Sequence, residues 1–268
     1  MKRALVGLAV ASLLVLSGYA ESPVDRYLAK AAPEQALIDA VVAGDEAAVG
    51  ALVARGIPLN ARDRFGRTAL IAAADAGYGD IVMTLLAGGA EVDAAKPDGW
   101  TPLMAAAHKG HRAIVSALLQ SGASVTSRLV SGYTPLLAAI ESGDCEMIAG
   151  LIDAGANPNE ATYDGWTPLM GAALRGQPDV VRELLAVGAD PNARNHESWT
   201  ALLAAVETGK EEVVNALVEG DADINAIPRD GMSPLMRASA RDDHLMVETL
   251  TDKGSSTAKE LIGVATAH

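Results

Sequence analysis

The sequence predicts an all-α solenoid of about seven 33-residue helix-turn-helix repeats with short hairpin tips. The first observation is a repeated heptapeptide, because DGWTPLM occurs at 98–104 and again at 164–170. The second is that SGYTPLL lies midway, at 131–137, which sets the period at 33 residues. The third is that two helical patterns recur in register at this period. A fixed period of 20 to 50 residues indicates stacked repeats rather than a single globular core.

The first helix of each repeat begins near a threonine and ends at a glycine. The threonine position holds Gln35, Thr68, Thr101, Thr134, Thr167, Thr200 and Ser233. Leucine follows two positions later in every copy, and alanine three positions after that. A proline directly after the threonine suits the first turn of a helix, where no backbone N–H is missed. The helix then ends at Gly44, Gly77, Gly110, Gly143, Gly176 and Gly209, because a positive φ is favourable for glycine. The seventh copy has Asp242 there.

The second helix of each repeat shows an apolar face at 3.6-residue spacing. Its marker position holds Val49, Val82, Val115, Ile148, Val181, Val214 and Val247. Pairs such as Leu85-Leu86 and Leu184-Leu185 follow it. Segments such as GAEVD, GANPN and GADPN then predict an extended tip that leads into the next repeat.

These motifs resemble the ankyrin repeat family, whose pattern is G-x-T-P-L-H-x-A-A-x-x-G followed by V-x-x-L-L-x-x-G-A. The resemblance covers roughly residues 32 to 256. It implies two antiparallel helices per repeat and a projecting hairpin-like tip, stacked into a curved solenoid that is stabilised by contacts between neighbours. The chain departs from the family at the histidine position, which is apolar in every copy: Ile38, Ile71, Met104, Leu137, Met170, Leu203 and Met236. This departure replaces a polar layer between repeats by an apolar one.

The register divides the chain into caps and repeats. The predicted repeats are 32–64, 65–97, 98–130, 131–163, 164–196, 197–229 and 230–256. We expect a capping helix over 21–33, with Val24, Tyr27, Leu28 and Ala31 on one face. We expect a second cap over 257–268, where Thr257 and Glu260 form a capping box.

The first twenty residues have the pattern of a signal peptide. Lys2 and Arg3 precede an apolar stretch from position 4 to 16, which is shorter than the ~20 residues of a membrane-spanning helix. Small residues before Glu21 predict cleavage near Ala20. A buried N-terminal helix is the alternative, but this segment has no polar face. Tyr19 stands where a bacterial lipoprotein signal has its lipid-bearing cysteine, so the mature form is expected to be periplasmic or secreted without a membrane anchor.

Composition restricts the classes of partner and chemistry. The net charge is −13, which argues against nucleic acid or anionic lipid as a partner. The single cysteine, Cys145, excludes an internal disulfide and a multi-thiolate metal site. Its acidic neighbours Asp144 and Glu146 disfavour a thiolate nucleophile.

No motif predicts catalysis, a metal or a cofactor. His108 and His111 are separated by the helix-ending Gly110. The segment from Asp221 to Asn225 resembles the start of a calcium loop, but the glycine and the final glutamate of such a loop are missing. The chain has no phosphate-binding glycine loop and no nucleophile elbow. We therefore expect a protein that is not an enzyme and has no cofactor.

The residue before each threonine is the candidate binding position. All three tryptophans of the chain occur there, and two apolar residues of the fourth tip are added to the candidates. The predicted partner-binding residues are Arg67, Trp100, Leu129, Val130, Tyr133, Trp166, Trp199 and Met232. Successive repeats ~10 Å apart would align the aromatic residues along the tips, and tryptophan and tyrosine dominate binding hot spots. The alternative is that they only brace neighbouring tips.

Charges of alternating sign form a second pattern on the first helices. The series reads Asp75, Lys109, Glu141, Arg175, Glu207 and Arg241. We expect neighbouring repeats to pair these charges, and each exposed pair contributes at most ~1 kcal/mol. A partner with matching charges is the alternative use of the series.

The sequence thus predicts a monomeric, non-catalytic protein-binding scaffold of the bacterial periplasm, similar to exported bacterial ankyrin repeat proteins. The partner is expected to be another protein, bound through the tips and the concave face, and a basic protein is one candidate. Three narrower roles stay open: an immunity protein against a toxin, a support factor for a periplasmic oxidant-defence enzyme, and a secreted effector that binds host proteins.

Overall fold

The computed structural model describes residues 24–255, and this range holds fifteen α-helices and no β-strand. The predicted signal peptide and the predicted C-terminal cap lie outside the described residues. The chain divides at Ser124 into two compact units. Within the described range, no helix is long and apolar enough to cross a membrane.

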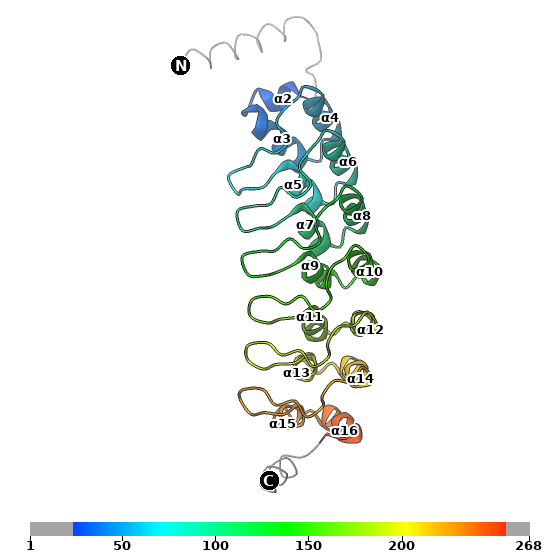
Figure 1. The fold of residues 1–268 in the computed structure, drawn as a ribbon. Coiled ribbons are helices and arrows are strands. Elements are labelled where there is room, and N and C mark those ends of the chain that lie inside the picture. Colours follow the sequence, from blue (N-terminus) through cyan, green and yellow to red (C-terminus); the bar gives the residue numbers. More distant parts are fainter. Residues whose placement is uncertain (1–23, 256–268) are drawn as a thin grey trace, which may run out of the picture. The chain divides into compact units, whose positions relative to one another are not determined.

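The first unit consists of a short helix followed by helix pairs. Its helices are α2 (Asp25–Leu28), α3 (Pro33–Val42), α4 (Glu46–Ala54), α5 (Ala69–Ala76), α6 (Gly79–Ala87), α7 (Pro102–Lys109) and α8 (Arg112–Gln120). The first helices α3, α5 and α7 pack in one layer, and the second helices α4, α6 and α8 pack in another (Figure 1). Helix α2 packs on α3 and buries Val24, which is 1% exposed.

The second unit repeats this arrangement. Its helices are α9 (Pro135–Ser142), α10 (Cys145–Asp153), α11 (Pro168–Arg175), α12 (Pro178–Ala186), α13 (Ala201–Glu207), α14 (Glu211–Glu219), α15 (Pro234–Ala240) and α16 (His244–Asp252). The first helices α9, α11, α13 and α15 pack in sequence, and a tip loop precedes each of them (Figure 1). The second helices α10, α12 and α14 form the other layer.

The threonine or serine that marks the second to seventh repeats is a buried N-cap. In the first repeat, Gln35 lies inside α3, which begins at Pro33. The Thr167 hydroxyl accepts a hydrogen bond from the Met170 N–H at 3.2 Å and so satisfies one of the free donors at the start of α11. The same bond recurs at Thr68, Thr101, Thr134, Thr200 and Ser233. The glycines that end the first helices have φ between 67° and 81°, as the sequence predicts.

The tips are tight turns rather than strand hairpins. In the fifth tip, the Thr162 N–H donates to the Trp166 carbonyl, and the Gly165 N–H donates to the Thr162 carbonyl, both at 2.9 Å. Neighbouring tips of the second unit are also joined, because Tyr163 N–H donates to the Ser131 carbonyl and His196 N–H to the Asp164 carbonyl. One backbone hydrogen bond between each pair of these neighbouring tips aligns them. It is too few to form the series of hydrogen bonds that makes a β-ladder.

The apolar replacements of the family's histidine form the core. Met104 and Met170 are fully buried, whereas Met236 of α15 is 37% exposed. Polar contacts between repeats also occur at the loop asparagines. Asn159 accepts from the Asp190 N–H at 2.7 Å and donates to the Gly188 carbonyl at 2.9 Å. Asn192 makes the same two bonds one repeat later, so the loops carry a recurring polar connection between repeats.

Ser198 provides a test of the tip geometry. It has φ 60° at the turn position where other tips have glycine, such as Gly165 at 83°. Left-handed backbone costs a non-glycine residue ~1–2 kcal/mol, part of which is offset because glycine is more disordered in the unfolded chain. We expect Ser198→Gly to raise the free energy of unfolding by about 0.5–1 kcal/mol in urea titrations.

The matched control is Ser116→Gly in the interior of α8. There the backbone is helical, so the substitution should lower the free energy of unfolding by about 0.5–1 kcal/mol. Two changes of the same sign would show that the φ of Ser198 is not the cause.

Candidate partner-binding surface

The predicted tip residues lie over the first helices instead of projecting into solvent. Arg67, Trp100, Tyr133, Trp166, Trp199 and Met232 are all of intermediate exposure, as is Leu129. Val130 is the exception and is 77% exposed. The side chains before each threonine therefore line the space between a tip and the first helices of its unit.

In the first unit, Arg67 helps to form a groove of about 380 Å³ between the second tip and α3. Its Nε lies 2.9 Å from the Asp63 carboxylate, and its guanidinium lies 5.4 Å from the Phe65 ring centroid. Phe65 and Val42 on the groove walls are 59% and 56% exposed. The 33-residue register did not single out Phe65 or Val42, because neither residue type recurs at the equivalent positions of the other copies.

In the first unit, the Trp100 ring contacts His108 and Lys96. Its ring meets the His108 ring edge-on at a centroid distance of 5.8 Å, and Lys96 Nζ lies 5.7 Å from the centroid. His111 points elsewhere, with Nε2 3.3 Å from the Asp75 carbonyl oxygen. Residues 24–255 contain no group of three or more metal-ligating side chains.

In the second unit, Tyr133 and Trp166 line one groove of about 280 Å³. The floor is formed by residues of α9 and α11, among them Glu141 and Arg175. Leu174, on the groove wall, is 41% exposed. Two aromatic side chains, an exposed leucine and an ion pair thus meet within one hollow that is open to solvent.

Hydrogen bonds hold Tyr133 in this groove. Its hydroxyl lies 3.1 Å from both the Leu137 carbonyl and the Glu141 carboxylate. Burial raises the pKa of Tyr133 above its ordinary value, although the nearby Arg175 charge opposes this. The phenol therefore remains protonated at neutral pH and can donate to Glu141.

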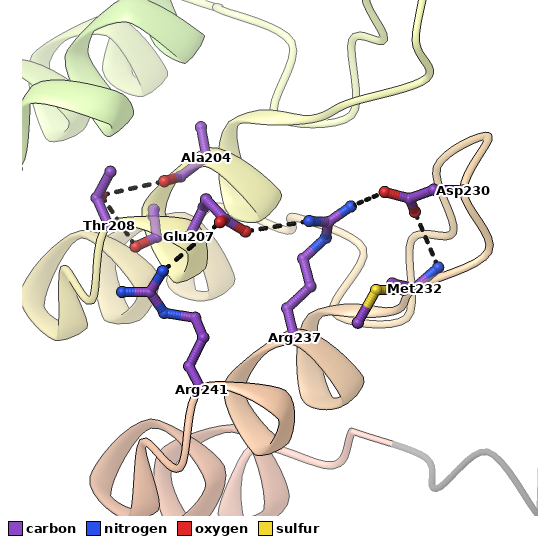
Figure 2. Close-up of polar contacts among 8 residues, drawn as sticks. Ala204, Glu207, Thr208, Asp230, Met232, Arg237 and Arg241 are labelled. Atoms are coloured by element: carbon purple, nitrogen blue, oxygen red, sulfur yellow. Dashed lines mark hydrogen bonds and ion pairs between the residues drawn. The ribbon is translucent and has the colours of Figure 1, made fainter.

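Trp199, at the equivalent place two repeats later, is covered by an arginine. The Arg237 guanidinium lies 4.5 Å from the Trp199 ring centroid, and only 8% of Arg237 is exposed. Figure 2 shows Arg237 between the carboxylates of Glu207 and Asp230, while Arg241 contacts the second oxygen of Glu207. In the same tip, the Met232 N–H donates a hydrogen bond to the Asp230 carboxylate at 3.0 Å.

Two of the expected pairs of alternating charges form between neighbouring repeats of the second unit. Arg175 pairs with Glu141, and Arg241 lies 3.6 Å from Glu207. Sequence reasoning missed Arg237, which stands where the preceding copies of the second unit have Ala138, Gly171 and Ala204. It also missed Tyr163, a tip residue that is 62% exposed.

Cys145 is unsuited to nucleophilic chemistry. Burial is the largest cause that raises the pKa of its thiol, and Asp179, Glu183 and Asp144 raise it further. The sequence indicated the effect of Asp144, but the two acidic residues of α12 are brought near only by the fold. A thiol in such surroundings stays protonated at neutral pH.

Asp63 is expected to make the second tip sensitive to acid. Burial of its carboxyl raises the pKa, but hydrogen bonds from the Arg67 N–H and side chain and from the Phe65 N–H outweigh this, so the pKa is lowered overall. A lowered pKa in the folded state stabilises the fold above the unfolded pKa, about 3.9, and this stabilisation is lost as the pH falls through the folded pKa. We expect the free energy of unfolding to fall below about pH 4.

Asp63→Asn should lower the free energy of unfolding by about 1–3 kcal/mol at pH 7, because the charge-assisted bonds are weakened. The substitution should also make the free energy of unfolding fall less steeply as the pH is lowered. Urea titrations of both proteins between neutral and acidic pH measure the effect. If the free energies of unfolding of the two proteins stay parallel over the whole pH range, Asp63 does not contribute to the acid sensitivity.

Comparisons with known proteins agree with this architecture. The family model described as ankyrin repeats (3 copies) matches residues 37–129, 126–195 and 172–260. The crystal structure of the human ASB11 ankyrin repeat domain is similar at 26% identity and a TM-score of 0.75, over 83% of this chain and 99% of that one. A search of curated proteins found no match. Ankyrin repeats are generally non-catalytic scaffolds that bind other proteins. The helix pairs, the capped tips and the family match show that this chain belongs to the ankyrin repeat family.

Proposed function

We propose that this chain is a non-catalytic scaffold of about seven repeats that binds a protein partner in the bacterial periplasm. The groove that carries this proposal lies in the second unit between Tyr133 and Trp166. Its half-buried aromatic walls and the exposed Leu174 form a preorganised apolar surface with polar groups at its floor. Binding hot spots have this composition, because rigid aromatic side chains contribute contact area at a small entropic cost.

The pattern of the N-terminal sequence supports the periplasmic part of the proposal. Lys2, Arg3 and the apolar stretch after them have the pattern of a signal peptide, with cleavage before Glu21. N-terminal sequencing of the protein isolated from a periplasmic fraction should read from Glu21. A protein that starts at Met1 and stays in the cytoplasm would exclude this localisation.

Affinity capture from a periplasmic extract of the source cell, repeated at rising salt, tests the scaffold function. A specific partner should be retained by the unchanged protein and reduced by Trp166→Ala. A partner lost at high salt would be bound chiefly by charge, because exposed charges are screened within about 8–10 Å. A partner retained at high salt would point to the aromatic groove. The identity of the partner then separates a toxin from a defence enzyme or a host protein.

A further inference from the structure

Two equivalent places in the second unit, one an open groove and the other filled by a side chain, are related by a shift of 66 residues. The shift relates Tyr133 to Trp199, Glu141 to Glu207, Asp164 to Asp230, Gly171 to Arg237 and Arg175 to Arg241. The first groove lies between the fourth and fifth copies of the pattern, and we call it the central groove. The second lies between the sixth and seventh copies, and we call it the terminal groove.

In the terminal groove, one side chain of the protein occupies the space. Arg237 Nη1 lies 3.0 Å from Glu207, and Nη2 contacts Asp230 (Figure 2). The Cζ of Arg237 lies over the Trp199 ring, 4.5 Å from its centroid. Two carboxylates and an aromatic face match the shape and charge of a guanidinium. The Nε of Arg237 is buried without a hydrogen-bond partner. The ion pairs with Glu207 and Asp230 and the contact with Trp199 therefore hold the side chain in place.

In the central groove, the surrounding groups are present and the occupant is not. Tyr133, Glu141 and Asp164 line the hollow of about 280 Å³, and Gly171 stands where the terminal groove has Arg237. Trp166 adds a second aromatic wall. The sequence therefore repeats the cradle but omits the arginine that fills it.

The Asp164 carboxylate is uncommitted in this groove. In the terminal groove, Asp230 accepts from the Met232 N–H at 3.0 Å, but the corresponding Trp166 N–H donates to the Thr162 hydroxyl at 3.1 Å. Among residues 24–255, no hydrogen bond or ion pair engages the Asp164 side chain. Glu141 pairs with Arg175 through one oxygen and accepts the Tyr133 hydroxyl through the other, and Glu207 pairs with Arg241 and Arg237. A carboxylate has about four acceptor sites. These two partners thus leave acceptor sites on Glu141 for a further guanidinium.

We infer that the central groove binds an arginine side chain of a protein partner, in the way that the terminal groove binds Arg237. The guanidinium stacks on Tyr133 and pairs with Asp164 and Glu141. This inference rests on the proposed function and specifies the chemistry of the partner. The net charge of −13 favours the approach of such a group.

A blocked pentapeptide with one arginine between glycines is the probe. In amide NMR spectra of the full chain, it should shift the Trp166 and Gly171 signals, with a dissociation constant on the order of 1 mM. The lysine analogue should bind about fivefold more weakly, because it has no planar fork and stacks less well. Equal binding of the two peptides, or no shift at either residue, would overturn the inference.

Asp164→Asn should weaken the arginine peptide about fivefold, the effect of losing one exposed charged partner. The matched control is Glu197→Gln, at the same place in the next tip, where the preceding first helix has Leu174 instead of an acid. It should leave binding unchanged. If both variants weaken binding equally, the peptide responds to net charge and not to the groove.

Gly171→Arg offers a second test, independent of any partner. A Cβ at Gly171 would meet only Ile140 Cγ2 at 3.4 Å, so a side chain can be added. The new arginine should fill the groove, abolish the peptide shifts and raise the Tm by about 2–4 °C over Gly171→Gln, the matched uncharged variant. Equal Tm values with peptide binding intact would contradict the inference.

The two proposals fail differently. If the peptide does not bind but Trp166→Ala still reduces partner capture, the arginine inference is wrong and the scaffold function stands. If the peptide binds as described but no protein is captured from the extract, the arginine site stands and the scaffold function is wrong.

Discussion

Leu169→Ala is expected to lower the free energy of unfolding by about 2–5 kcal/mol, the range for truncating a buried leucine. Leu169 is 1% exposed on α11, and this helix packs against α9, α12 and α13. Truncation removes apolar contacts and leaves a cavity that its neighbours fill only in part, because the first helices of the unit are packed along their length. The loss should be measured by urea titration followed by circular dichroism.

Hydrogen exchange should localise this loss. Repeat stacks are stabilised by contacts between adjacent units, so α9, α11 and α13 should lose protection first. The control is Leu245→Ala, because Leu245 of α16 is 59% exposed and its truncation should cost less than about 1 kcal/mol. A similar loss in both variants would show that packing around α11 is not what stabilises the second unit.

Trp166→Ala is expected to weaken binding of the captured partner by about 2 kcal/mol, roughly 30-fold, the threshold of a hot spot. Trp166 is only half-buried and lines the central groove, so much of its ring is available to a partner. A fully buried tryptophan would instead cost ~3–5 kcal/mol of stability on truncation. For this half-buried ring we expect a smaller loss, about 1–2 kcal/mol, since part of the ring is already exposed in the folded protein.

Melting and partner affinity measured on the same variant separate the two roles of Trp166. Trp166→Phe keeps an aromatic wall, so it should recover most of the affinity. Tyr163→Ala is the control on the same tip, because Tyr163 is 62% exposed and does not line the groove. A large loss of stability with unchanged affinity in the folded fraction would mean that Trp166 only braces the tip.

The sequence by itself determined the helix pairs and their ends. The 33-residue register placed Thr167 at the start of a helix and Gly176 after its end, and both lie there in the structure. This was possible because caps and core positions depend on residues three to five positions apart. The family followed from the same local motifs, since each copy repeats them.

Tertiary structure decided which side chains meet across copies. The register placed Trp166 and Tyr133 at tips, but only the packed helices show that they line one groove with Glu141. Sequence reasoning missed Phe65, Tyr163 and Arg237. Each differs in type from the residues at the equivalent positions of the other copies, so the periodicity did not indicate them. The pairing of Arg237 with Glu207 spans 30 residues and requires neighbouring repeats to be stacked. Local sequence determines where a helix begins and ends, whereas the cradle around a guanidinium exists only after two copies have packed together.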